Sequence, residues 1–211
     1  MTRKPGMNPN IPIKKNDITL IVGRKGCGKS TLAGSLIKTA RRLIVLDPQC
    51  EYNIGVKVNN FHDFADMVSR YRFSEDFKIC YFPQDMTNRK KWFDVICGVV
   101  YNAGDLTFVV EELGIFMSAT SFPEEFAKLV MTSRHKRISI LGITQRATKI
   151  PRDLRSQADR IYTFHQVEPI DLKYISEFME MQNVNRIKSL TDHNYILWLP
   201  DGKTIKSKLI C

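Results

Sequence analysis

The sequence predicts an α/β fold built on one mainly parallel, doubly wound sheet with helices on both faces. Short apolar runs alternate with amphipathic segments along most of the chain, the pattern of strands joined by helical crossovers. A glycine-rich segment directly follows the first apolar run and precedes a helical pattern. At 211 residues, with 43% hydrophobic and 26% charged residues, the chain has the size and composition of one globular domain.

The elements are expected in alternating order. Six short apolar runs predict strands at residues 18–22, 42–47, 78–82, 106–110, 138–144 and 160–164. Helical spacing of apolar residues predicts helices at residues 31–40, 60–72, 90–101, 123–134 and 169–181. Two final strands, 193–199 and 204–210, are joined by the turn Pro200-Asp201-Gly202 and should form an antiparallel hairpin at the sheet edge. Residues 1–16 are expected to be a basic arm, and residues 17–211 a single domain.

The glycine-rich segment has the sequence GRKGCGKS and matches the GxxxxGKS phosphate-binding pattern at every fixed position. Its glycines let backbone N–H groups approach phosphate oxygens, and the positive end of the next helix faces the same phosphates. Lys29 should reach the β- and γ-phosphates, and Ser30 should offer a hydroxyl to Mg²⁺. We expect a nucleoside triphosphate to bind to Gly23, Arg24, Lys25, Gly26, Cys27, Gly28, Lys29, Ser30 and Thr31. Within this loop Cys27 is interpreted as a spacer.

Two acids end the strand predicted at residues 106–110. Glu111 is placed to hold Mg²⁺, directly or through water. Glu112 is then available to orient and deprotonate the water that attacks the γ-phosphate, so the tandem favours hydrolysis. Gln145 follows the next predicted strand and could contact both the γ-phosphate and that water. All three residues follow strands, and ligands bind at the carboxyl ends of strands in such sheets.

Arg134 lies just before the strand at residues 138–144. At a subunit edge its guanidinium could reach a neighbour's nucleotide site and stabilise transition-state charge as an arginine finger. The alternative for Arg134 is a surface or DNA-facing position, and Arg152 and Arg155 are rival candidates for the arginine finger.

The charge balance suggests a polyanionic partner. The net charge is +10, and basic residues gather near the N-terminus, between residues 134 and 160, and near the C-terminus. The five cysteines are scattered without a CxxC pair, which favours reduced thiols in a cytoplasm-like compartment and argues against a zinc site. No apolar run approaches the roughly 20 residues of a membrane span, and no secretory signal is recognisable.

Taken together, the motifs resemble the FtsK–HerA superfamily of RecA-like (ASCE) P-loop ATPases, and within it the genome-packaging ATPases of internal-membrane icosahedral viruses. The resemblance covers residues 17–166 and rests on GRKGCGKST, LIVLDPQCEY, TFVVEE, SRHKRISILGITQR and IPRDLRSQADRIYTF. It assigns the phosphate-loop lysine and hydroxyl to Lys29 and Ser30, the acids to Glu111 and Glu112, the glutamine to Gln145 and the trans-acting arginine to Arg134. Many relatives carry Asp where this chain has Glu111.

The resemblance implies an ATP- and Mg²⁺-dependent motor for double-stranded DNA. Such a motor would package a viral genome into a preformed capsid as a homo-oligomeric ring, expected to be a hexamer, in the host cytoplasm or associated with the virion. Capsid or membrane vertex proteins would be further partners. The alternatives are an export or conjugation ATPase, a small-molecule P-loop kinase, and a nucleotide-gated binding module without turnover. A kinase has no need for Gln145, and a switch has no need for a water activator such as Glu112.

Overall fold

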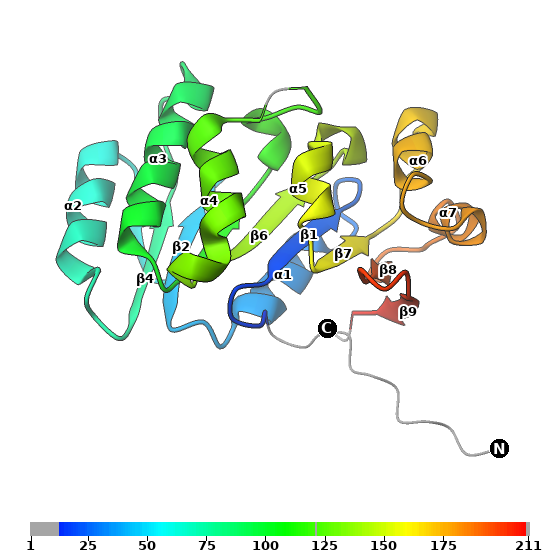
Figure 1. Cartoon of the computed structure of the whole chain (residues 1–211), viewed down its shortest axis with the longest axis horizontal. Helices are drawn as coiled ribbons and strands as arrows, with labels where there is room; N and C mark the ends of the chain where they lie inside the picture. The colour runs from blue at the N-terminus through cyan, green and yellow to red at the C-terminus, as the bar shows by residue number, and fades with distance from the viewer. Residues whose placement is uncertain (1–12, 121, 210–211) are drawn as a thin grey trace, which may run out of the picture.

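The computed structural model describes residues 13–120 and 122–209, which form a nine-stranded sheet covered by helices (Figure 1). The strand order is β3-β4-β2-β5-β6-β1-β7-β8-β9. All pairs from β3 to β7 are parallel, whereas β7–β8 and β8–β9 are antiparallel. The predicted mainly parallel sheet with a C-terminal antiparallel hairpin is therefore confirmed.

The bounds of the elements are as follows. The strands are β1 (Ile18–Val22), β2 (Arg42–Leu46), β3 (Val56–Val58), β4 (Phe77–Tyr81), β5 (Thr107–Val110), β6 (Ser139–Thr144), β7 (Arg160–Thr163), β8 (Asn194–Trp198) and β9 (Thr204–Lys208). The helices are α1 (Lys29–Ile37), α2 (Phe61–Tyr71), α3 (Arg89–Ala103), α4 (Glu124–Lys136), α5 (Arg152–Ser156), α6 (Pro169–Ile175) and α7 (Met181–Ile187), with 3₁₀ helices η1 (Leu113–Ile115) and η2 (Ala147–Lys149).

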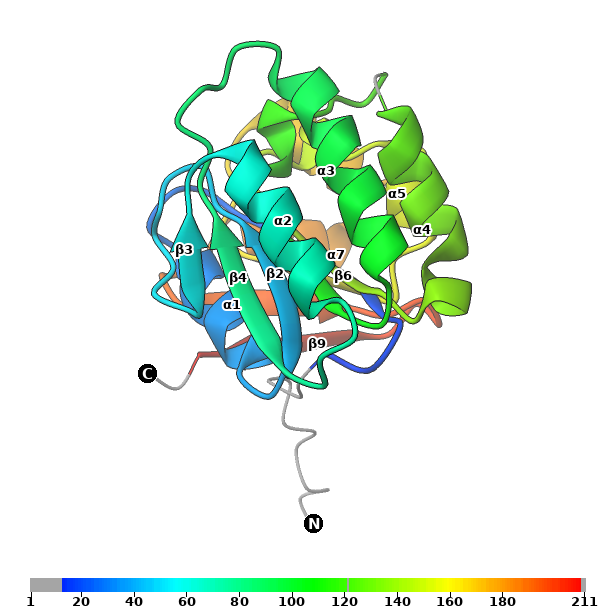
Figure 2. The same ribbon diagram turned by 90° about the vertical axis from the view of Figure 1, so that its left-hand side faces the viewer.

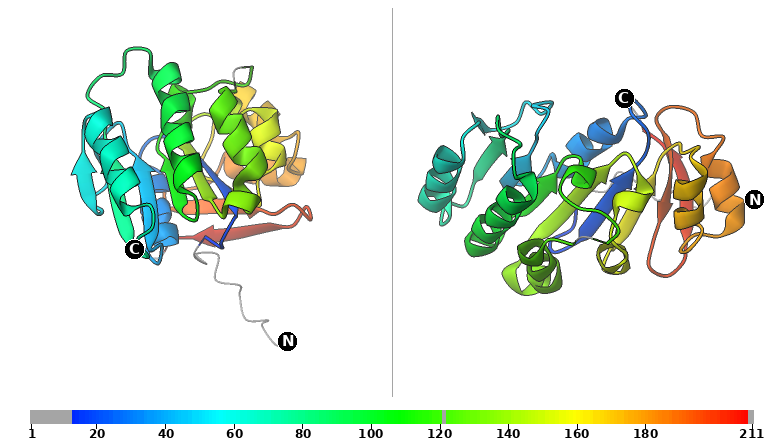
Figure 3. Two further views of the ribbon diagram at one scale, coloured as in Figure 1. Left: turned by 60° about the vertical axis from the view of Figure 1, so that its left-hand side comes forward. Right: turned by 90° about the horizontal axis from the view of Figure 1, so that it is seen from above.

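The two faces of the sheet carry different helices. Side chains alternate between the two faces along a strand. Leu20 therefore packs in the hydrophobic core between the sheet and helices α2 to α7, while Ile21 packs in the core between the sheet and α1. The views from the side and from above show α1 on one face and α2, α3 and α4 on the other (Figures 2 and 3). Both faces of the central strands are buried, which is why these strands are continuous apolar runs.

The largest difference from the predicted elements is in the helix expected at residues 169–181. The structure has two helices, α6 and α7, with turns over residues 176–180. Met179 in the connection is 4% exposed, and the ring of Phe178 meets Trp198 edge-on at 5.6 Å. The turn between the helices thus coincides with the burial of Met179 and with the packing of partly buried Phe178 against the core. The three-residue β3 and five-residue α5 are too short to show a periodic pattern.

Residues 13–16 of the predicted arm pack on α1 and on the start of β6. The Ile13 backbone N–H donates to the Leu36 carbonyl over 3.2 Å, and the Asn16 N–H donates to Ser139 Oγ over 2.9 Å. Residues 1–12 and residue 210, the predicted end of the last strand, lie outside the described residues. In the described part of the chain, no helix combines the length and apolar character needed to cross a bilayer.

Candidate active site

The phosphate loop connects β1 to α1 and requires its glycines. Gly26 and Gly28 have φ values of +80° and +100°, in the left-handed region that other residues avoid. A Cβ atom on Gly23 would lie 2.5 Å from Cβ of Phe164, so a side chain there would displace β7's end. Gly28 turns the chain directly into the first residue of α1, Lys29.

The C-terminal hairpin supports the loop from behind. The His193 backbone N–H donates to the Cys27 carbonyl over 3.1 Å, and Leu209 N–H donates to the His193 carbonyl over 2.8 Å. A Cβ on Gly28 would lie 2.8 Å from Cδ2 of His193 and 2.9 Å from Cδ1 of Leu209. The Cys27 side chain is 1% exposed, and burial raises the pKa of its thiol although Lys29 opposes the shift. Cys27 is thus a buried neutral side chain of the loop.

The N-terminus of α1 is suited to an anion. No acidic residue occupies its first turn, and no side chain caps its free N–H groups. Lys29 is 8% exposed, and its Nζ donates to the Arg24 carbonyl over 3.0 Å, so the ammonium lies over the loop. Together the loop and helix end place a cation and several backbone donors at one spot.

The first acid, Glu111, is buried beside the loop at 5% exposure. Its Oε2 accepts the hydroxyl of Tyr52 over 2.8 Å. Burial raises the pKa of Glu111 to about 7, a shift that the Tyr52 hydrogen bond opposes and that Glu51 and Asp47 reinforce. Burial also raises the pKa of the Tyr52 hydroxyl, which therefore stays a donor.

Three residues after β2 complete this part of the site and were absent from the predicted site residues. The Asp47 carboxylate is buried and accepts the Tyr52 N–H over 2.8 Å, which shapes the turn. The Tyr52 hydroxyl in turn donates a hydrogen bond to Glu111. The preceding residue, Glu51, accepts a hydrogen bond from the Ser30 hydroxyl at its Oε2, over 3.4 Å. The sequence signal for them is the LIVLDPQCEY stretch.

The second acid, Glu112, lies in the left-handed region at φ 56°. Its Oε2 accepts a hydrogen bond from the Gln145 side-chain Nε2 over 3.0 Å, and its Oε1 accepts one from the Gln145 backbone N–H over 3.4 Å. This contact exists because β6 lies between β1 and β5 in the sheet. Gly142 in β6 leaves room for Leu113, since a Cβ there would come within 2.3 Å of Cδ1 of Leu113. Strained backbone at such a carboxylate is typical of functional sites.

The oxygen donors near Ser30 fit Mg²⁺. Mg²⁺ prefers oxygen ligands, keeps several waters, and is usually held by one or two carboxylates together with substrate phosphates. The Ser30 hydroxyl and the Glu51 and Glu111 carboxylates supply such oxygens. Among the described residues no three acidic, histidine or cysteine side chains are grouped to hold a metal by themselves, so phosphate oxygens would complete the shell.

The three candidate arginines lie away from the phosphate loop of their own chain. Arg134 is near the end of α4, at the amino ends of the strands, where its side chain is 77% exposed and lies 3.6 Å from the Asp159 carboxylate. Arg152 and Arg155 both bind Glu177, over 2.7 and 2.8 Å, and hold the pKa of that carboxyl at about 2. Any of them would act on a nucleotide only from a neighbouring subunit.

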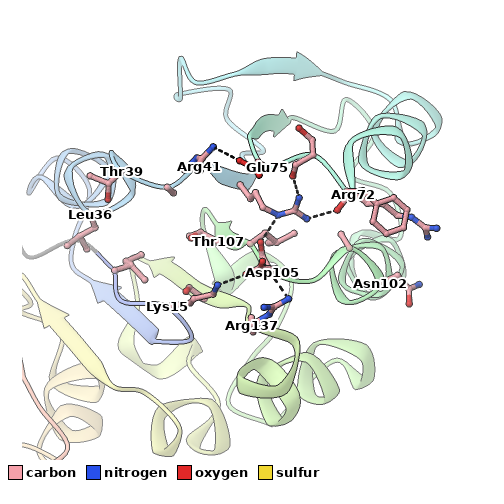
Figure 4. A pocket seen from close by; sticks show the side chains of 18 residues that line it. Lys15, Leu36, Thr39, Arg41, Arg72, Glu75, Asn102, Asp105, Thr107 and Arg137 are labelled. Atoms are coloured by element: carbon pink, nitrogen blue, oxygen red, sulfur yellow. Dashed lines mark hydrogen bonds and ion pairs between the residues drawn. The ribbon is translucent and has the colours of Figure 1, made fainter.

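A large open cavity of about 950 Å³ lies at the amino ends of β2, β5 and β6, at the opposite end of these strands from the candidate site (Figure 4). Asp105 on its wall pairs with Lys15 at 2.9 Å and with Arg137 at 3.8 Å. Arg42 donates to the carbonyls of Arg72 and Asp105, among others, and so binds the ends of α2 and α3. These groups are paired with one another, and the cavity is separate from the phosphate loop and the acids of the candidate site.

No protein-family model and no curated protein matches the sequence. Solved structures do match. The genome packaging NTPase B204 from Sulfolobus turreted icosahedral virus 2, in complex with AMPPCP, has a TM-score of 0.76 and 21% identity over 93% of this chain and 99% of that chain. The pCW3 conjugation coupling protein TcpA with ATPγS has a TM-score of 0.58 and 15% identity over 92% and 60%.

The N-terminal domain of zonular occludens toxin from Neisseria meningitidis also matches, with a TM-score of 0.51 and 15% identity over 93% of this chain and 95% of that chain. At these identities the similarity establishes the fold. In the sheet of this chain, β6, which precedes Gln145, lies between β1, which precedes the phosphate loop, and β5, which precedes the two acids. The chain therefore shares the α/β fold of these proteins, with its glycine-rich phosphate loop between the first strand of the chain and the first helix.

Proposed function

We propose that this protein is an ATPase that moves double-stranded DNA and packages a viral genome into a preformed capsid. The observation that carries the hydrolytic part is the contact between Glu112 and Gln145 beside the phosphate loop. A carboxylate held by an amide at the end of a neighbouring strand is suited to orient and deprotonate water. Nucleotide binding alone would not require it.

Each residue then has a defined task. The loop N–H groups and Lys29 bind the phosphates and neutralise charge that develops on them. Ser30, Glu111 and Glu51 would hold Mg²⁺, which when bound stabilises charge on the β- and γ-phosphate oxygens. Glu112 accepts the proton of the attacking water, and Gln145 keeps the carboxylate in place. Tyr52 holds Glu111 beside the loop.

DNA and ring assembly are supported by charge and by the fold. The net charge of +10 suits a polyanion, and the chain has no recognisable base-reading module. B204 is described as a genome packaging NTPase and TcpA as a conjugation coupling protein. We infer sequence-independent binding to duplex DNA by a homo-oligomeric ring, expected to be a hexamer, with Arg134 as the trans-acting arginine. Capsid or membrane vertex proteins would anchor it in the host cytoplasm or on the virion.

A conjugation or export ATPase is the second candidate, favoured by the similarity to TcpA. A small-molecule kinase is less well supported, because Glu112 is bound by Gln145 at the site where a kinase would receive an acceptor hydroxyl.

The test is ATP hydrolysis by the purified protein with and without duplex DNA. The proposal expects that duplex DNA stimulates ATP turnover. It also expects native mass spectrometry to detect an oligomer with the mass of a closed ring. Phosphorylation of an added nucleoside would support a kinase instead. Stimulation by single-stranded DNA alone would favour the export alternative.

A further inference from the structure

Asp171 is a completely buried carboxylate outside the nucleotide site, with an exposure of 0%. It lies in the first turn of α6 and binds the segment that follows β6. Arg146 Nε donates to its Oδ2 over 2.5 Å, and the N–H and hydroxyl of Thr148 donate to its Oδ1 over 3.0 and 2.8 Å. A buried charge is costly unless it is paired and hydrogen-bonded, so this carboxylate joins α6 to that segment in one geometry.

The bound segment starts one residue after Gln145. The Gln145 carbonyl accepts Nε2 of Gln166, a residue that precedes α6 and is 3% exposed. The Tyr174 hydroxyl, also on α6, donates to the Ile150 carbonyl over 2.7 Å. Groups on or just before α6 thus bind residues 145, 146, 148 and 150. The first of these is the glutamine whose side-chain amide contacts Glu112, and the others follow it directly in the chain.

We propose that Asp171 is a positioning residue that holds Gln145 against Glu112 through Arg146 and Thr148. The inference rests on the proposed function of the Glu112–Gln145 pair. Arg146 is the next residue after Gln145, so a shift of its backbone turns the Gln145 amide away from the carboxylate. Misplacement of catalytic groups by about 1 Å can lower turnover about a hundredfold. The helix α6 thereby sets the geometry for activation of water.

A second clamp with the same chemistry provides a matched control. Glu177, just after α6, binds Arg152 and Arg155 of α5. This clamp holds α5, several residues beyond Gln145. Its connection to the segment 145–150 is indirect: Arg155 lies over the ring of Tyr174 at 4.7 Å, and Tyr174 binds the Ile150 carbonyl, at the far end of the segment from Gln145. Loss of Glu177 would loosen the same region without acting on Gln145.

The test compares Asp171→Asn with Glu177→Gln in the full chain. The Asn side chain keeps the volume but can place an N–H against Arg146. We expect kcat to fall about ten- to a hundredfold, KM for ATP to change less than about twofold, and amide exchange at residues 145–149 to become faster. Glu177→Gln should change neither kcat nor that exchange. Arg146→Gln removes the same contact from a half-exposed side chain and should reproduce the effect if Asp171→Asn does not fold.

Equal loss of activity in the Asp171 and Glu177 variants would overturn the inference, because it would indicate general destabilisation. Unchanged kcat and exchange in Asp171→Asn would also overturn it. A wild-type protein that binds ATP without turnover would refute the proposed function instead. Exchange at residues 145–149 would then decide the positioning role: faster exchange in Asp171→Asn alone supports it, and unchanged exchange rejects it.

Discussion

The side-chain amide of Gln145 and the carboxylate of Glu112 are hydrogen-bonded across the ends of two neighbouring strands, with 3.0 Å between Nε2 and Oε2. The backbone N–H of Gln145 approaches the other carboxylate oxygen at 3.4 Å. A carboxylate gripped on both oxygens by one residue has little freedom to rotate. Its direction relative to the phosphate loop is therefore set by the sheet.

Glu112→Gln should retain ATP affinity and lose at least about a hundredfold in turnover, because the amide cannot accept a proton from water. Steady-state hydrolysis and binding of a fluorescent ATP analogue measure the two quantities separately. Loss of turnover in Glu111→Gln but not in Glu112→Gln would show that the two acids have the opposite roles.

Lys29→Ala should abolish productive ATP binding and hydrolysis while the fold stays intact, since the ammonium lies over the loop, where it donates to the Arg24 carbonyl, and not in the hydrophobic core. Nucleotide binding and circular dichroism would show this. Lys38→Ala, an exposed lysine at the other end of α1, is the control and should bind as the wild type does. Normal ATP turnover by a folded Lys29→Ala protein would contradict the assignment of this loop as the phosphate-binding site.

Stability should depend on pH through Glu111, whose pKa is about 7 in the folded protein against an ordinary value of 4.5. Between these values the folded state binds the extra proton, so the free energy of unfolding falls as pH rises from about 4.5 to about 7. Glu111→Gln lacks this slope. The variant should be more stable than the wild type at pH 8 by about 1–3 kcal/mol, and the difference should shrink at pH 5.

Urea unfolding at both pH values, without nucleotide or Mg²⁺, is the measurement for Glu111. A difference between the proteins that is independent of pH would show that burial does not perturb this carboxyl.

Arg134→Ala should impair hydrolysis only in assembled rings, because the side chain is exposed far from its own phosphate loop. Mixing Arg134→Ala with Glu112→Gln subunits should restore part of the activity, since one kind of interface then has both an intact arginine and an intact base. A normal rate for Arg134→Ala alone, without any effect of mixing, would transfer the role to Arg152 or Arg155.

Duplex DNA should bind with similar affinity whatever its sequence, and binding should weaken steeply with salt, with a slope near −0.9 per neutralised phosphate. Neutralising Lys149, Arg152 and Arg155 together should flatten that slope. Because Glu177 already pairs with both arginines, Lys149→Gln should account for most of the change. Fluorescence anisotropy over a salt series measures it, and salt-insensitive binding or a strong preference for one duplex would contradict the packaging role.

The features that the sequence predicts well are those encoded within a few residues. The phosphate loop and the acids at the end of β5 are contiguous motifs, and buried parallel strands are uninterrupted apolar runs. The contact between Tyr52 and Glu111 joins residues 59 positions apart, so only the folded chain shows it. The end of α6 is hard to predict for a similar reason: Met179 is buried and Phe178 packs on the distant Trp198, although the helical pattern of the sequence continues to Met181.

The support of the phosphate loop by His193 and Leu209 has a consequence for how the protein is made. The loop ends at Ser30, yet its rear wall is supplied by residues translated more than 160 positions later. A ribosome that has passed only the nucleotide motifs has produced a loop without its backing. The hydrogen bonds that link Cys27, His193 and Leu209 can therefore all form only after residue 209 has left the exit tunnel, so the loop acquires its native backing late in synthesis.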